Sequence, residues 1–222
     1  MPRLVRLPRL LALGALLLAA RPAGALDLSW TALGGYQGGG VVRVSGTASH
    51  LFKLPLSLEL GIGHAFVDPG NADKARQVFI NDATDGTPEK SGGVWDLRAD
   101  AVWGLKVAGL SDVGVFGGVR YSMFSGRFRY VGGNEDFTIT SDAWGVGVGV
   151  RASLPINARF SLTGSLGLDW FPQQTLYGHD TSYSSNGDSV NGRAGFGWGA
   201  ADHAVNQPWL LPSLLVGATW RP

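Results

Sequence analysis

The charged side chains that could carry chemistry are few and widely spaced. Five acids and four arginines alternate with apolar residues: Asp27, Arg43, Glu59, Asp96, Arg98, Asp100, Arg120, Arg151 and Asp169. Paired carboxylates such as Asp96 and Asp100 are groups that general acid–base catalysis uses. The charges are nearly balanced, however, and buried arginines and carboxylates need each other as partners. We therefore predict an enclosed network of salt bridges at these positions rather than an active site.

The remaining polar residues do not form a metal motif. A polar segment, residues 173–207, contains four possible ligands, His179, Asp180, Asp188 and His203, but their spacing matches no known ligand loop. The chain has no cysteine, which excludes disulfides and thiolate sites. We expect no metal and no cofactor. The aromatic residues of this segment lie among Ser, Gly and Asn, a composition typical of adaptable binding surfaces. Exposed loops of this composition can also be simply solvated, so both interpretations are open.

These residues require elements that point them to one side, and eight segments of the chain alternate with period two. In each, one set of alternate residues is apolar, and the other is Gly, Ser or Thr with isolated charges. The contrast is clearest in 95–105, 143–154 and 159–170. The other five segments are 27–32, 42–48, 56–63, 113–123 and 210–221. Helical spacing is not found after the N-terminal segment, so the sequence predicts an all-β chain.

Two β architectures alternate in this way, a soluble sandwich and a transmembrane barrel. The polar face of a sandwich meets water and is usually rich in Lys, Glu and Thr, whereas here it is small and poor in Lys. Glycine accounts for 34 of 222 residues, which suits a narrow lumen. We predict an eight-stranded antiparallel up-and-down transmembrane β-barrel. An aromatic girdle at both edges of its apolar band would contain Trp30, Trp95, Trp103, Trp144, Trp170 and Trp220.

The connections between the predicted strands alternate between two kinds. Residues 50–55, 108–112 and 155–157 are predicted to be tight turns. Residues 67–93 and 173–207 are long and polar, and 37–40 and 132–136 are brief members of the same set. Outer-membrane barrels have short periplasmic turns and longer extracellular loops. The charges of Arg127 and Arg129 further predict that two strands continue beyond the membrane as a short hairpin.

The N-terminus predicts export. Arg3, Arg6 and Arg9 precede the apolar run 10–20, and the small residues 23–25 form a signal peptidase site. We predict a cleaved signal peptide, residues 1–25, followed by a single barrel domain, residues 26–222. Four arginines leave with the signal, so the formal net charge falls from +1 to −3. No basic cluster remains for nucleic acid.

The chain resembles the small eight-stranded outer-membrane barrels of the OmpA and OmpX type. The most local similarity is Leu215-Val216-Gly217-Ala218-Thr219-Trp220, which is similar to the assembly signal of such barrels, with Gly217 three residues before the aromatic Trp220. The resemblance implies an integral outer-membrane location, contact with membrane lipid and lipopolysaccharide, a barrel-assembly machinery as transient partner, and a monomer.

Three functions are open to such a barrel. The first is a non-enzymatic role in envelope structure, with surface recognition through the loops. The second is lipid A modification, which some of these barrels perform with Ser and His on the lipid-facing wall; here His64 has the outward parity, but its neighbours on that face are Ile62 and Phe66. The third is a narrow channel for small solutes. We expect the first, because an eight-stranded lumen is filled by its own side chains.

Overall fold

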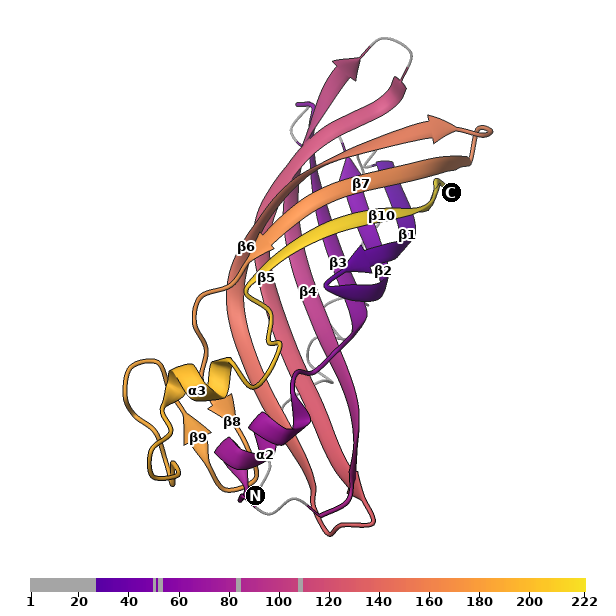
Figure 1. Ribbon diagram of the computed structural model, residues 1–222. Helices are drawn as coiled ribbons and strands as arrows, with labels where there is room; N and C mark the ends of the chain where they lie inside the picture. The colour runs from indigo at the N-terminus through magenta and orange to yellow at the C-terminus, as the bar shows by residue number, and fades with distance from the viewer. Residues whose placement is uncertain (1–26, 50, 52–53, 83–84, 108–109) are drawn as a thin grey trace.

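Eight antiparallel strands close on themselves in the computed structural model of the chain, which describes residues 27–49, 51, 54–82, 85–107 and 110–222. The strands of the ring are β1 (Asp27–Gln37), β2 (Gly39–Ser49), β3 (Leu56–Val67), β4 (Thr87–Val107), β5 (Leu110–Val131), β6 (Asp136–Pro155), β7 (Phe160–Trp170) and β10 (Leu210–Trp220). Each pairs with the next along the chain, β7 pairs with β10, and β10 pairs with β1 (Figure 1). The predicted eight-stranded barrel is confirmed. The predicted signal peptide lies outside the described residues.

The outer wall of the barrel is a band of exposed apolar side chains. In β6 and β7, Val146, Val148, Leu166 and Leu168 are each more than 40% exposed, whereas the alternate residues face inward. Six exposed tryptophans lie on this wall. Trp30 pairs in register with Trp220 near one edge, and Trp144 and Trp170 lie near the other. From Phe160 to Trp170 a strand rises roughly 33 Å, or about 25 Å when tilted, which matches the apolar thickness of an outer membrane.

The turns and loops have the predicted asymmetry, but several boundaries differ. Gln37, Gly39 and Gly40, predicted in a loop, belong to β1 and β2, and Gly38 alone (φ 70°) connects them. β5 begins at Leu110, inside the segment predicted as a turn. Between β6 and β7 the side chain of Asn157 accepts hydrogen bonds from the amides of Arg159 and Phe160 and closes a tight turn. The C-terminus lies at this short-turn end (Figure 1).

Three strands are much longer than a membrane requires. β4, β5 and β6 contain 21, 22 and 20 residues. Their pairing continues past Trp95 and Trp144, and the three strands extend together beyond the other strands of the ring (Figure 1). The predicted protruding hairpin of β5 and β6 is therefore present and has a third strand. The prediction that residues 67–93 form one loop is wrong, because residues 87–93 belong to β4. Charged residues on both faces there, such as Glu89 and Lys90, hide the alternation.

The same segment contains a helix that sequence reasoning missed. Helix α2 (Ala72–Phe79) begins after Asn71, whose side chain accepts a hydrogen bond from the amide of Lys74. Its buried residues include Ala72, Ala75 and Phe79, which lie on one helical face. A second short helix, α3 (Trp198–Asp202), and two short strands, β8 (Leu176–Tyr177) and β9 (Ser182–Tyr183), lie in the long connection between β7 and β10. Among the described residues, no helix is long and apolar enough to cross a membrane.

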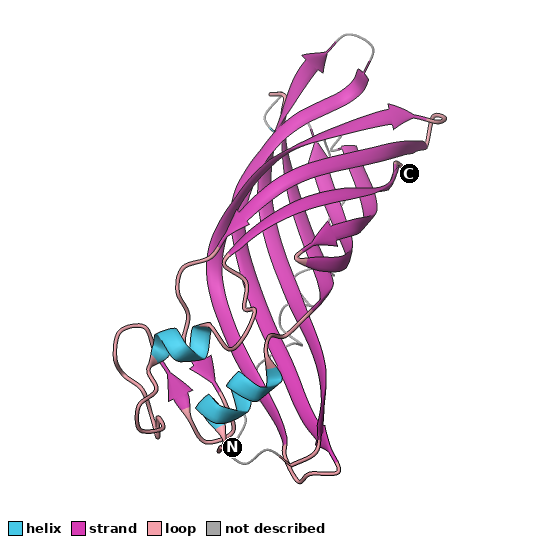
Figure 2. Ribbon diagram, viewed as in Figure 1, coloured by secondary structure: helices cyan, strands magenta, loops and turns pink. Residues whose placement is uncertain are grey.

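These elements fold together at the long-loop end into a unit that we call the distal lobe, comprising residues 68–82, 85–93, 124–143 and 171–209 (Figure 2). Its centre is apolar: Phe79, Phe128, Ile139, Leu176 and Tyr183 are at most 1% exposed and belong to one cluster. The hydroxyl of Tyr183 donates to the carbonyl of Val78 at 2.7 Å and joins the 171–209 connection to α2. The long loops are therefore a folded structure, and their apolar cluster continues into the mouth of the barrel through Val41, Ala65 and Val94.

Candidate functional site: a salt-bridge network in the lumen

Glycine makes room in the lumen for large charged side chains. β6 presents Gly145, Gly147 and Gly149 inward. A Cβ atom on Gly147 would overlap Oδ1 of Asp169 and lie 2.6 Å from Nε of Arg120. Arg120 of β5 can therefore reach Asp169 of β7 only because Gly147 of β6, which lies between them, has no side chain.

Asp169 of β7 is the centre of the network. Its Oδ1 accepts a hydrogen bond from Nε of Arg120 at 2.8 Å, and its Oδ2 accepts one from Nη2 of Arg98 at 2.9 Å. Arg120 also donates from Nη1 to Asp100 at 2.8 Å, and Arg98 donates from Nε to Asp96 at 3.1 Å. All five side chains are at most 9% exposed. Strands β4, β5 and β7 are thus joined across the lumen by charge-assisted hydrogen bonds.

Arg43 joins the network through Gln37, a neutral residue that the sequence analysis did not place in the lumen. Its Nη2 donates to Oε1 of Gln37, and the amide of Gln37 donates to Oδ2 of Asp169 at 2.8 Å. Its Nε also lies 4.0 Å from Asp96. Three arginines and three aspartates therefore share one buried network. The signal for Gln37 was its parity, since it follows Thr31 by six residues on the inward face of β1.

The other predicted site residues lie outside this network. Arg151 pairs with Glu59, which also accepts a hydrogen bond from the hydroxyl of Thr47 at 2.9 Å. Asp27, at the start of β1 opposite Ser49, is exposed and so does not belong to the buried group. Towards the short-turn end the lumen is filled by a chain of hydroxyls, with Thr219 bonded to Thr31 at 2.8 Å and to Thr163 at 2.7 Å.

The lumen is also closed on the side of the distal lobe. Between the network and the lobe lies a cavity of only about 10 Å³, roughly the space of one water molecule. Its lining includes Gln37, Asp96 and Ser122 and, from above, Phe171 and Leu211. Phe171 is 1% exposed. The apolar side chains of Phe171 and Leu211 therefore cover the charged network on the side of the distal lobe.

The outward face around His64 lacks a nucleophile. The imidazole lies against the rings of Phe66 and Trp95, with centroids 4.7 and 4.6 Å away. In register it faces Val42 on one neighbouring strand and Trp95 on the other. None of these neighbours carries a hydroxyl or a carboxylate. Across the described part of the chain, no three His, Asp or Glu side chains gather as metal ligands.

The two residues of the predicted assembly signal occupy different environments. Trp220 is 41% exposed on the outer wall, paired with Trp30 and Phe160. Gly217 faces the lumen, and a Cβ atom there would overlap the carbonyl oxygen of Ala32 on β1. A close approach of two backbones accounts for this glycine.

Comparison with one solved structure supports the same architecture, and two others are more distantly similar. The chain superimposes on a major outer membrane protein from Thermus thermophilus with a TM-score of 0.69 and 25% sequence identity, over 90% of this chain and 100% of that one. Neisserial surface protein A gives a TM-score of 0.42 at 12% identity, over 89% and 96% of the two chains. CarO2 of Acinetobacter baumannii gives 0.45 at 11%, over 89% and 99%. No family model and no curated protein matches the sequence.

The Thermus structure and the lipid-facing band together identify the chain as an integral β-barrel of the bacterial outer membrane. In barrels of this kind the short turns usually face the periplasm and the longer loops the outside of the cell.

Proposed function

We propose that this protein is a non-enzymatic component of the outer membrane, with a plugged, non-conducting barrel that anchors the distal lobe at the cell surface for recognition. The observation that carries the proposal is the set of bonds that Asp169 makes to Arg98 and Arg120, because they join three strands through the middle of the lumen. Moving a solute past them would require breaking charge-assisted bonds between groups that have no access to water, which costs several kcal/mol for each uncompensated ion.

The distal lobe supports the second part of the proposal. A flexible loop would suffice to connect β7 to β10, yet residues 171–209 are held to α2 by hydrogen bonds from Tyr183 and Arg193. Arg193 also forms a bidentate ion pair with Asp82. A surface fixed in this way loses little conformational entropy when it binds a partner.

Planar-bilayer recording of the refolded full chain tests the plug. We expect no stepwise conductance for the wild-type protein and for Arg127→Ala, which removes an exposed ion pair outside the lumen. We expect measurable current from an Arg98→Ala, Arg120→Ala double variant that still folds, as judged by its mobility on unheated gels. Conductance of the wild type would overturn the proposal in favour of a channel. Mass spectrometry of lipid A from cells with and without the protein tests the enzymatic alternative, and we expect identical spectra.

We also propose that Trp220 serves recognition by a barrel-assembly machinery, whereas Gly217 serves the fold. Trp220 is exposed, so Trp220→Ala leaves spontaneous refolding in detergent unchanged but slows assembly in vesicles that contain the machinery. Gly217→Ala slows both, because its methyl group meets the backbone of β1. Equal behaviour of the two variants in both assays would contradict this division. Contacts with lipopolysaccharide and a monomeric state complete the proposal, and native mass spectrometry in detergent measures both.

A further inference from the structure

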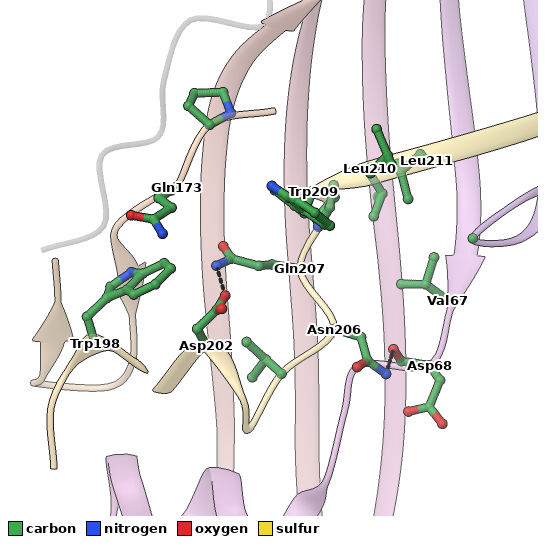
Figure 3. A pocket seen from close by; sticks show the side chains of 15 residues that line it. Val67, Asp68, Gln173, Trp198, Asp202, Asn206, Gln207, Trp209, Leu210 and Leu211 are labelled. Carbon is green, nitrogen blue, oxygen red and sulfur yellow. Dashed lines mark hydrogen bonds between the residues drawn. The ribbon is translucent and has the colours of Figure 1, made fainter. Parts of the chain in front are cut away.

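A cavity of about 640 Å³ opens beside the mouth of the barrel, between the distal lobe and the edge of the lipid-facing wall (Figure 3). Its walls come from the β1–β2 connection at Gly38, the end of β3 at Val67 and Asp68, β4 at Val94, the start of β10 at Leu210 and Leu211, and two parts of the 171–209 connection. Its volume lies within the range of small-molecule sites, roughly 300–1,000 Å³. It has room for a ligand of one or two sugar rings.

The side chains that line the cavity combine two indoles with neutral hydrogen-bonding groups. Trp198 and Trp209 supply flat apolar surfaces. Gln173, Asn206 and Gln207 supply amides, each of which both donates and accepts hydrogen bonds. A sugar ring has the complementary chemistry, with a face of C–H groups and a rim of hydroxyls that donate and accept. Gln207 lies between the two indoles in Figure 3.

Charge argues against an anionic ligand. No Lys or Arg is found among the described residues that line the cavity, whereas Asp68 and Asp202 are. Asp68 is already paired with Lys90, whose ammonium lies 2.7 Å from Oδ1 and 2.8 Å from Oδ2. Asp202 accepts a hydrogen bond from the amide of Gln207 at 2.6 Å. The cavity therefore offers acceptors to hydroxyl groups and repels phosphates and carboxylates.

The polar groups of the cavity are fixed before any ligand arrives. The indole nitrogen of Trp198 donates to the carbonyl of Gln174 at 2.6 Å. Asn206 donates from its backbone to Pro69 at 3.0 Å and from its side chain to the carbonyl of Asp68 at 3.2 Å. Oε1 of Gln207 is buried and has no protein partner, although the amide nitrogen of the same side chain is bonded. A hydroxyl of the ligand would satisfy this acceptor.

We propose that this cavity binds a neutral saccharide, with the ring packed on the indoles and its hydroxyls bonded to Gln207 and Asn206. The inference rests on the proposed surface recognition and names its ligand class. Trp209 and Leu210 are 62% and 43% exposed, and Leu210 pairs in register with Trp170 of the outer aromatic row. The cavity thus lies at headgroup height, so the sugar is supplied by the headgroup of a membrane glycolipid or by a free glycan.

The test uses the refolded full chain in detergent with two sets of probes. Free neutral disaccharides are measured by saturation-transfer NMR, beside an acidic sugar of the same size. Digalactosyl diacylglycerol is measured by native mass spectrometry, beside phosphatidylglycerol. We expect binding of a neutral sugar in at least one arm, and the arm that responds identifies the source. No binding in either arm, or a preference for the acidic sugar or phosphatidylglycerol, overturns the inference.

Two cavity variants and one matched control assign the binding to this site. We expect Gln207→Leu to weaken binding about tenfold, the loss typical of a hydrogen bond to a buried group. Trp198→Phe, which keeps a ring but removes the bond to Gln174, weakens it less. Trp144→Phe changes a tryptophan on the outer wall, 67% exposed, and leaves binding unchanged. Equal affinity in all three variants refutes the cavity as the site. If the protein does not conduct and binds no sugar, only the saccharide inference is overturned. If the protein conducts, the proposed plug is overturned.

Discussion

The barrel lumen and the distal lobe are built on the same strands with opposite chemistry. Along β5 the inward residues change from Arg120 and Ser122 to Phe124 and Phe128, and the outward residues change from Val119 to Arg127. Below the aromatic row the outside is apolar and the inside polar, and above it the pattern is that of a soluble protein. The strand geometry does not change at this point. What changes is the solvent around the strand. Alternation therefore shows that a strand has two different faces, and which face is apolar shows whether the outer face meets lipid or water.

The largest difference between the two regions should follow from removing a charge in the lumen. Arg120→Ala leaves Asp100 without its ion pair and Asp169 without one of its two. We expect the free energy of unfolding to fall by about 3–5 kcal/mol, because both carboxylates are buried. Urea titration in lipid vesicles measures it. The control is Arg127→Ala, whose partner Asp136 is exposed; a loss in the control as large as that of Arg120→Ala would contradict the buried network.

In the distal lobe the corresponding change is the loss of an apolar side chain. Phe128 is fully buried and stacks on Phe137 with centroids 5.4 Å apart. We expect Phe128→Ala to destabilise the lobe by about 3 kcal/mol and to expose Arg193 to trypsin, while the barrel keeps its mobility on unheated gels. Phe160→Ala, on the lipid-facing wall, serves as control and leaves cleavage unchanged. Loss of the barrel together with the lobe would show that the two regions unfold as one.

Substitutions at two glycines distinguish the effect of packing in the lumen from the effect of removing a charge. We expect Gly147→Ala to destabilise the barrel by about 1–3 kcal/mol, since the methyl group displaces Asp169 from Arg120 without removing either. At Gly164, on the outer face of β7, a Cβ atom meets nothing within 4 Å, and Gly164→Ala should be close to neutral. The same vesicle titration compares them. Similar losses at both positions would mean that backbone flexibility, not the network, sets the stability of the barrel.

The smallest effect concerns an exposed ion pair of the distal lobe. Hydrogen bonds from Lys90 and from the amide of Gly70 lower the pKa of Asp68. A depressed carboxyl pKa contributes stability above the unfolded value of about 3.9, and that stability is lost as pH falls through the folded pKa. We expect Lys90→Met to cost under about 1 kcal/mol at pH 7 and less at low pH, where only the bond from Lys90 to the carbonyl of Gly70 is still lost; thermal unfolding measures both. Lys74→Met on α2 is the control, and an equal loss at both pH values would show that the ion pair with Asp68 contributes nothing.

Alternation made the barrel predictable, and the lumen only partly so. The parity of β6 and β7 is clear from their sequence, and it placed Arg98, Arg120 and Asp169 inward. It could not say which of them meet, because pairing across the lumen depends on the tilt and stagger of the strands. Gln37 was missed since its strand ends in four weakly patterned residues before the turn.

The distal lobe was beyond prediction for a different reason. Its apolar cluster joins residues of 72–79, 124–139 and 176–205, which are far apart in the chain. No single one of these segments is apolar enough to predict the cluster from sequence. Helix α2 left a local signal in Asn71 and the spacing of Ala72, Ala75 and Phe79. In a segment rich in Asp, Asn and Gly, that signal was outweighed by composition.

The continuation of β5 past the aromatic row raises part of the protein above the membrane. Nine residues, Met123 to Val131, rise roughly 25–30 Å along the strand and about 20 Å along the membrane normal. β4 and β6 pair with this part of β5 on its two sides, so the extension is a three-stranded sheet. A ligand from solution therefore meets the far end of this sheet, about 20 Å beyond the apolar band, whereas a ligand within the membrane meets only the part next to the bilayer.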